Sequence, residues 1–387
     1  MKSIYLDNSA TTRISEAALN KYVDVSREIY GNPSSLHTEG FRAEREINAV
    51  RATLLDALRA KDASVIFTAS GSEANNLAIL GRALAKERFR RGGKIITTDG
   101  EHASVILPED ELIKMGFKVV KISTRSGVFD IKQLEAELDG SVILISMMMV
   151  NNETGALYPT AQVASLMRMR SPDAVLHVDA TQSFMKLPFT KASSGADMIT
   201  VSAHKIHGPK GVGALIVDNK IIKNGGIRPI VLGGGQEGGL RSGTENVPAI
   251  AAFGVAIAEA RDRLQKSYTD ISALREYLIE RLSAELPEIS LTLPEVHAPH
   301  ILNITLPSIK SETMLHYLSS KDIFVSSGSA CSSNGGKVSS ALLAYGRSAD
   351  EADNSVRISL SYENTREDID ALIAALTEGI QTLARKR

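Results

Sequence analysis

Polar side chains that could do chemistry stand directly after apolar, β-branched runs of the sequence. Asp179 follows one such run, and Ser202, His204 and Lys205 follow another. Side chains at the carboxyl ends of strands in an open α/β sheet face a common crevice, where such folds bind ligands. A lysine at a buried strand end is costly to keep charged, so its pKa tends to fall and its amine becomes available for a Schiff base. Lys205 is therefore a candidate nucleophile.

A candidate phosphate site lies earlier, in the segment SVIFTASGSEANNLAILG. Gly71 and Ser72 stand between an apolar run and a helical pattern whose first turn carries Glu73. Free backbone N–H groups and the helix dipole at such a junction suit a phosphate. A tight capped turn without a ligand explains the junction equally well, so the interpretation depends on the neighbouring residues.

The lysine, the aspartate and the phosphate donors together match the needs of pyridoxal phosphate. This cofactor requires an amine, an acid at its pyridinium nitrogen and donors for its phosphate. Lys205 and Asp179 supply the first two, and the donors are Ser72, Ser202 and His204. Taken singly, Asp179 is explained as a turn cap and Lys205 as a surface residue. Their joint occurrence favours the cofactor site.

The only cysteine, Cys331, lies in VSSGSACSSNGGK, a stretch rich in serine and glycine. Such a composition is typical of a loop. A lone cysteine is more often a small buried hydrophobic residue, but these polar surroundings argue against burial. Cys331 is therefore a second candidate nucleophile, and no intrachain disulfide is possible.

These residues need a scaffold, and the pattern predicts an α/β fold. Between residues 64 and 218, short apolar runs alternate with longer helical stretches, which is typical of βαβ units that build a mainly parallel sheet. The predicted strands are 64–68, 94–98, 117–122, 142–150, 174–178, 198–201 and 212–217. A helical stretch then runs from Pro248 toward Leu286, followed by short strands at 301–306, 323–326 and 356–361 and a terminal helix that opens at Thr365.

At 387 residues the chain is longer than one core usually supports, so we expect two domains. We expect a large domain over residues 15–255. Segments 1–14 and 256–387 are expected to form a smaller α+β domain that carries the cysteine loop at about 326–337.

Composition excludes several classes of function. With 43% hydrophobic and 23% charged residues the chain should pack as a globular protein, and 44 basic against 45 acidic residues provide no general attraction to nucleic acid or membranes. The start MKSIYLDNSATT lacks a signal pattern and no apolar run could span a bilayer, so a cytoplasmic location is expected. The basic run 82–93 is interpreted as a solvated helix face, and His204 with His207 is not interpreted as a metal site.

Several motifs resemble those of cysteine desulfurases of the NifS/IscS type, within the class V aminotransferase family. They are LDNSATT, GNPSS, HVDATQS, SAHKIHGPKG, RSGTEN and SSGSAC, and they occur in order from Tyr5 to beyond Arg357. The resemblance implies a pyridoxal-phosphate-dependent transferase of fold type I with a seven-stranded sheet. One departure is His207, at a position where the family usually has an aromatic residue.

The resemblance also implies a role for each site residue. Lys205 would hold the cofactor and shuttle the substrate Cα proton, Asp179 would bind the ring nitrogen, and Gln182 would touch the phenolic oxygen. His102 in DGEHAS would stack on the ring and handle thiol protons, although a satisfied structural histidine is the alternative. The phosphate would be held by Gly71, Ser72, Ser202, His204 and, from the neighbouring subunit of a homodimer, Thr244.

The remaining implications concern the substrate and the acceptors. Asn152 and Arg357 would bind L-cysteine; Arg357 points away from the apolar face of Val356 and Ile358, and a guanidinium can grip a carboxylate bidentately. Cys331 would receive the sulfur as a persulfide, with L-alanine as the other product, and pass it to an iron–sulfur scaffold protein or a tRNA-thiolation enzyme. A selenocysteine lyase, an aminotransferase and a non-catalytic scaffold protein are the alternatives.

Overall fold

The largest sheet of the computed structural model, which describes residues 3–90, 92–327 and 338–384, has seven strands. Its order is β2-β8-β7-β6-β5-β3-β4. Strand β8 runs antiparallel to both β2 and β7, and every other neighbouring pair is parallel. The bounds are β2 (Ala63–Thr68), β3 (Lys94–Thr98), β4 (Lys118–Ile122), β5 (Val142–Met148), β6 (Val175–Asp179), β7 (Met198–Ser202) and β8 (Gly213–Asp218). The seven predicted strands and the α/β class are confirmed.

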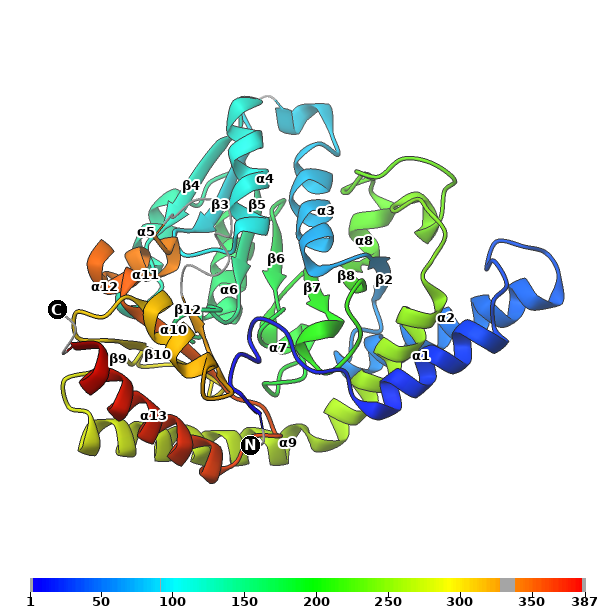
Figure 1. The fold of residues 1–387 in the computed structure, drawn as a ribbon. Helices are drawn as coiled ribbons and strands as arrows, with labels where there is room; N and C mark the ends of the chain where they lie inside the picture. Colours follow the sequence, from blue (N-terminus) through cyan, green and yellow to red (C-terminus); the bar gives the residue numbers. More distant parts are fainter. Residues whose placement is uncertain (1–2, 91, 328–337, 385–387) are drawn as a thin grey trace.

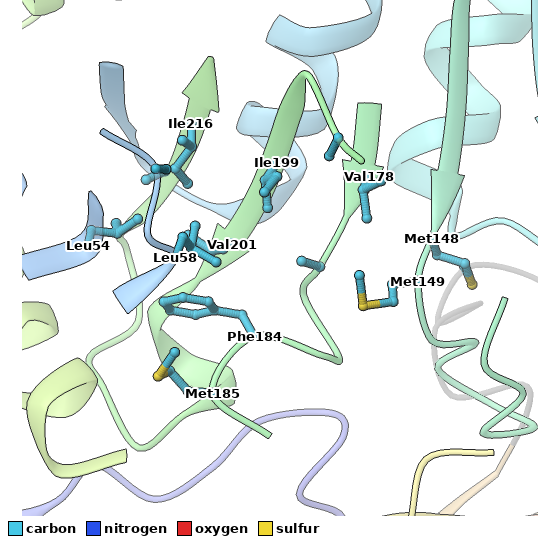
Figure 2. Packing of buried hydrophobic residues seen from close by; sticks show 14 of the residues in the cluster. Leu54, Leu58, Met148, Met149, Val178, Phe184, Met185, Ile199, Val201 and Ile216 are labelled. Carbon is cyan, nitrogen blue, oxygen red and sulfur yellow. The ribbon is translucent and has the colours of Figure 1, made fainter. Parts of the chain in front are cut away.

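Helices cover both faces of this sheet, because its strands are apolar on both sides. On β2, Val65 and Phe67 belong to one hydrophobic cluster and Ile66 to another. The cluster of Ile66 includes side chains of α3 (Gly71–Ala83) and α4 (Ala103–Lys114). The opposite cluster includes side chains of α1 (Glu16–Glu28), α2 (Thr38–Ala57), α6 (Thr160–Arg170) and α9 (Val247–Glu285). Figure 2 shows part of it around Phe184.

A second sheet, with four antiparallel strands in the order β12-β13-β10-β9, packs in a hydrophobic cluster of its own. The large sheet and this smaller sheet, each with its packed helices, are the two centres of the fold. Its strands are β9 (Ser290–Thr292), β10 (Ile301–Thr305), β12 (Ser326–Ser327) and β13 (Ser355–Ser359). A two-residue strand, β1 (Ile4–Tyr5), pairs in parallel with β11 (Ile323–Phe324). Helices α10 (Ser311–Ser319) and α13 (Arg366–Ala384) contribute to the same hydrophobic cluster as β10 and β13.

Helix α9, 39 residues long, joins the two centres (Figure 1). Its first half contributes Val247 and Phe253 to the cluster on the large sheet, and its second half contributes Leu278 and Leu282 to the other. Helices α1 and α2 contact α9, as does α13. The predicted boundary after residue 255 falls inside this continuous helix, and the division into domains stays a prediction.

The other described helices are short. They are α5 (Ile131–Glu137), α7 (Lys191–Ser194), α8 (Asn219–Lys223), α11 (Ser340–Tyr345) and α12 (Ala349–Asp353). In the described part of the chain no helix has the length and apolarity needed to cross a bilayer.

Candidate active site

A cavity of about 290 Å³ opens where β5, β6 and β7 end and α3 begins. Parallel neighbours such as β6 and β7 end on the same edge of the sheet, so the residues that follow them meet there. Ten of the residues predicted from the sequence line this cavity: Gly71, Ser72, His102, Asn152, Asp179, Gln182, Ser202, His204, Lys205 and Arg357.

Lys205 ends a short 3₁₀ turn, Ala203–Lys205, that directly follows β7. Its Nζ donates to the carbonyl oxygens of Ser9, at 2.6 Å, and of Ala10, at 2.7 Å. The N-terminal segment therefore forms part of the cavity wall. It is held there by Thr12, whose backbone N–H donates to the carbonyl of His204 at 2.8 Å.

Asp179, the last residue of β6, is buried and held by two donors. Its Oδ2 accepts a hydrogen bond from Asn75 Nδ2 at 2.7 Å, and its Oδ1 accepts one from the backbone N–H of Thr181 at 2.9 Å. Asn75 Nδ2 also donates to Ser104 Oγ at 2.9 Å. Asn75 was not among the predicted residues, although its spacing of four from Gly71 places both on one face of α3.

His102 is the N-cap of α4, and this role determines which ring nitrogen faces the cavity. Its Nδ1 accepts a hydrogen bond from the backbone N–H of Ser104 at 3.1 Å and lies 2.8 Å from Ser104 Oγ. Because a backbone N–H can only donate, the neutral ring carries its hydrogen on Nε2. Burial lowers the pKa of His102, which the charge of Asp179 partly opposes. A chain of contacts thus joins His102, Ser104, Asn75 and Asp179.

The start of α3 forms a cradle of N–H donors beside Ser202. Ser70 caps the helix by accepting from the backbone N–H of Glu73, so the N–H groups of Gly71 and Ser72 have no acceptor within the helix. Ser202 Oγ is buried and has no hydrogen-bond partner among the described residues. A Cβ on Gly71 would lie 3.3 Å from both Ser202 Cβ and Thr181 Oγ1, which is a tight contact.

His204 completes this side of the cavity as a neutral ring. Its Nδ1 lies 3.1 Å from Thr11 Oγ1. Burial, with a further effect from the nearby Lys205, lowers the pKa of His204 to about 4.

Arg357 reaches the cavity from β13 of the smaller sheet and is buried. Its Nη1 donates to the carbonyl oxygen of Asn152 at 2.9 Å, and its Nη2 donates to Asp7 Oδ1 at 2.9 Å. Burial raises the pKa of Asp7, and the charge of Arg357 opposes that rise. The sequence predicted that Arg357 and Asn152 act together, but it did not reveal Asp7, which is 350 residues away along the chain.

Among the described residues, one predicted residue lies elsewhere. Thr244 borders a separate cavity of about 180 Å³, together with Glu237 and Arg241. Cys331 lies outside the described residues. The predicted cysteine loop begins in β12, where Ser326 pairs with Arg357.

Comparisons with known proteins agree on one family. Residues 4–372 match the model of the family described as Aminotransferase class-V. The chain is 37% identical over 385 residues to a protein of Trichormus variabilis named cysteine desulfurase 2, which covers 99% of this chain and 94% of the relative. A solved structure titled NifS-like protein has a TM-score of 0.90 at 32% identity and covers 98% of this chain and all of its own. Another, titled SspA in complex with cysteine, has a TM-score of 0.80 at 30% identity and covers 93% of this chain and 99% of its own.

Proposed function

We propose that this chain, which belongs to the class V aminotransferase family and within it to the cysteine desulfurases of the NifS/IscS type, removes the sulfur atom of L-cysteine with the help of pyridoxal phosphate. One observation carries the proposal. A single cavity brings together the amine of Lys205, the carboxylate of Asp179, the start of α3 and the guanidinium of Arg357.

The polar groups of the cavity support pyridoxal phosphate as the cofactor. Lys205 would hold its aldehyde carbon, and the buried carboxylate of Asp179 would bind its ring nitrogen. The N–H groups of Gly71 and Ser72, with the unpaired Ser202 Oγ, would hold its phosphate. When bound, the cofactor supplies an electron sink that lets bonds at the substrate Cα and Cβ break.

Arg357 is the proposed anchor for the substrate carboxylate. A guanidinium has five N–H donors, and two of them are engaged by Asn152 and Asp7, so others remain for a carboxylate. Because Arg357 and Lys205 line the same cavity, a small amino acid held by this anchor would have its amino group within reach of Lys205.

Two side chains would handle protons. Lys205 Nζ would take the proton from the substrate Cα after the substrate amine has replaced it. His102 presents Nε2–H to the cavity, since its Nδ1 is engaged by Ser104, so it would donate a hydrogen bond to the cofactor or to the substrate.

Cys331 is proposed to accept the sulfur. Its thiolate would attack the substrate sulfur, so that an S–S bond forms while the bond from sulfur to Cβ breaks and its electron pair goes to Cβ. Protonation of that carbon leads to L-alanine and leaves a persulfide on Cys331. The family resemblance further suggests a cytoplasmic homodimer, with Thr244 of each subunit serving its partner, and delivery to an iron–sulfur scaffold protein or a tRNA-thiolation enzyme.

The test measures alanine and sulfide released from L-cysteine in the presence of a thiol reductant. The wild type should be yellow and release both products in equal amounts. Cys331→Ala should keep the cofactor absorbance and lose both products, whereas Lys205→Ala should lose the absorbance of covalently held cofactor as well. Unchanged turnover by Cys331→Ala would reject the persulfide step and favour a lyase or an aminotransferase.

A further inference from the structure

The amide of Gln182, in the wall of the candidate active site, has an orientation determined by two partners: Ser9 in the same wall and Lys186 behind it. Its Nε2 donates to the carbonyl oxygen of Ser9 at 2.9 Å, and its Oε1 accepts a hydrogen bond from Lys186 Nζ at 3.0 Å. A carbonyl oxygen can only accept, so the contact with Ser9 turns Nε2 toward that carbonyl and Oε1 toward Lys186, whose Nζ has hydrogens to donate whether it is charged or neutral. The second hydrogen on Nε2 is then the donor that Gln182 has left for the cavity.

Lys186 lies behind this wall, at a second cavity of about 60 Å³. That cavity is largely apolar, with Met185, Ile206 and Leu360 among its lining residues. Lys205 borders both cavities, so the two adjoin at this residue. A long basic side chain in such surroundings is costly to desolvate, and its retention needs an explanation.

The charged groups around Lys186 do little to offset the cost of burying its amine. Burial lowers the pKa of Lys186 well below its usual range, and the charges of Lys205 and Arg357 lower it further. The carboxylate that borders the second cavity, Glu259, accepts a hydrogen bond from Ser15 Oγ at 2.5 Å and lies 3.8 Å from the guanidinium of Arg263. The titratable rings there, His207 and His300, both have a pKa lowered chiefly by burial. The one described side-chain hydrogen bond of Lys186 is the one to Gln182.

We propose that Lys186 is a positioning residue: from behind the active-site wall it holds the amide of Gln182 so that an N–H, and not the amide oxygen, faces the phenolic oxygen of the bound cofactor. This inference rests on the proposed function, because it concerns the wall that faces the cofactor. Without Lys186 the amide loses one of its two constraints and can turn its oxygen toward the cofactor, where two acceptors would repel each other.

The experiment follows the absorbance of bound cofactor as the pH is raised, in protein loaded with pyridoxal phosphate. An N–H donor on the phenolic oxygen draws electron density from the chromophore and makes its proton easier to lose. Lys186→Met should therefore move the midpoint of the absorbance change upward by about one pH unit, and cofactor affinity should fall. Lys186→Arg keeps N–H donors and has room in the second cavity, so it should stay closer to the wild-type midpoint. Methionine suits the apolar surroundings, so the thermal midpoint should not fall.

A double-mutant comparison separates this role from others. If Lys186 acts through Gln182, the double variant Lys186→Met with Gln182→Leu should match Gln182→Leu alone. Lys223→Met, a change at an exposed lysine that ends α8, serves as the matched control and should leave the midpoint unchanged. Additive shifts, or a wild-type midpoint in Lys186→Met beside a shifted Gln182→Leu, would overturn the inference while leaving the proposed function intact. A wild-type protein that gains no absorbance band with the cofactor would overturn both.

Discussion

Among single residues, Asn75 has the strongest claim to a role that sequence motifs did not indicate. Its side-chain amide donates both hydrogens, one to Asp179 and one to Ser104, and Ser104 in turn contacts the ring of His102. The two groups that the cofactor ring would meet are therefore oriented by one buried amide. Its own Oδ1 has no hydrogen-bond partner among the described residues.

Asn75→Ala should weaken cofactor binding roughly ten- to a hundredfold, because a hydrogen bond to a carboxylate contributes about 1.5 to 3 kcal/mol. Titration of the apoprotein with pyridoxal phosphate, followed by absorbance, measures the change. Asn76→Ala is the matched control, since Asn76 Nδ2 donates to the backbone carbonyl of Ser72 and does not touch Asp179. Equal affinities for the two variants would contradict the role of Asn75.

At the level of elements, the first turn of helix α3 supplies the backbone N–H groups of the proposed phosphate site. Ser70 satisfies one free N–H of that turn, and Gly71 allows the backbone to approach Ser202 and Thr181 closely. The helix dipole adds partial positive charge at the same point. If this is the proposed phosphate site, a change here should affect binding of the phosphate and not of the pyridine ring.

Gly71→Ala should therefore weaken binding of pyridoxal phosphate more than binding of pyridoxal, which lacks the phosphate. A tight Cβ contact costs about 1 to 3 kcal/mol, which corresponds to a loss of roughly five- to a hundredfold. Absorbance titration with each compound gives the ratio. Gly140→Ala, where an added Cβ meets no atom within 4 Å, should change neither affinity. Equal losses for both compounds would argue against a phosphate site.

Across the whole molecule, the N-terminal segment connects the two centres of the fold at the active site. Strand β1 pairs with β11 beside the smaller sheet, Asp7 bonds to Arg357, and the carbonyls of Ser9 and Ala10 accept from Lys205. Leu6, between these contacts, is fully buried in the cluster around the smaller sheet. The segment thus positions the proposed substrate anchor relative to the proposed cofactor lysine.

Asp7→Ala should lower the free energy of unfolding by about 3 kcal/mol, because loss of one partner leaves the buried guanidinium of Arg357 uncompensated. The KM for L-cysteine should rise more than kcat falls, since Arg357 is displaced and the catalytic groups are not. Denaturant unfolding and steady-state kinetics measure the two effects. Asp270→Ala removes an exposed partner of Lys266 and should cost less than about 1 kcal/mol. A change no larger than this control's would contradict the proposed link.

Features of the fold that depend on local pattern were predicted well. The seven strands of the large sheet correspond to short, continuous apolar runs, and helices α9 and α13 correspond to longer stretches with a helical pattern. The short strands β1 and β9 were missed, because two or three residues carry no periodic signal and are defined by the strand they pair with.

The sequence by itself determined which residues end the strands, and therefore that Asp179 and Lys205 would meet at one edge of the sheet. It also determined the family, since the motifs run in order along nearly the whole chain. Only the tertiary structure decided which residues hold these groups in place: Asn75 on Asp179, Lys186 on Gln182 and Asp7 on Arg357, of which only Lys186 is near its partner in the chain. The physical reason is that a hydrogen bond depends on positions in space, and for Asp7 and Arg357 these are set by the pairing of strands far apart in the chain. A local sequence pattern holds no record of such pairing.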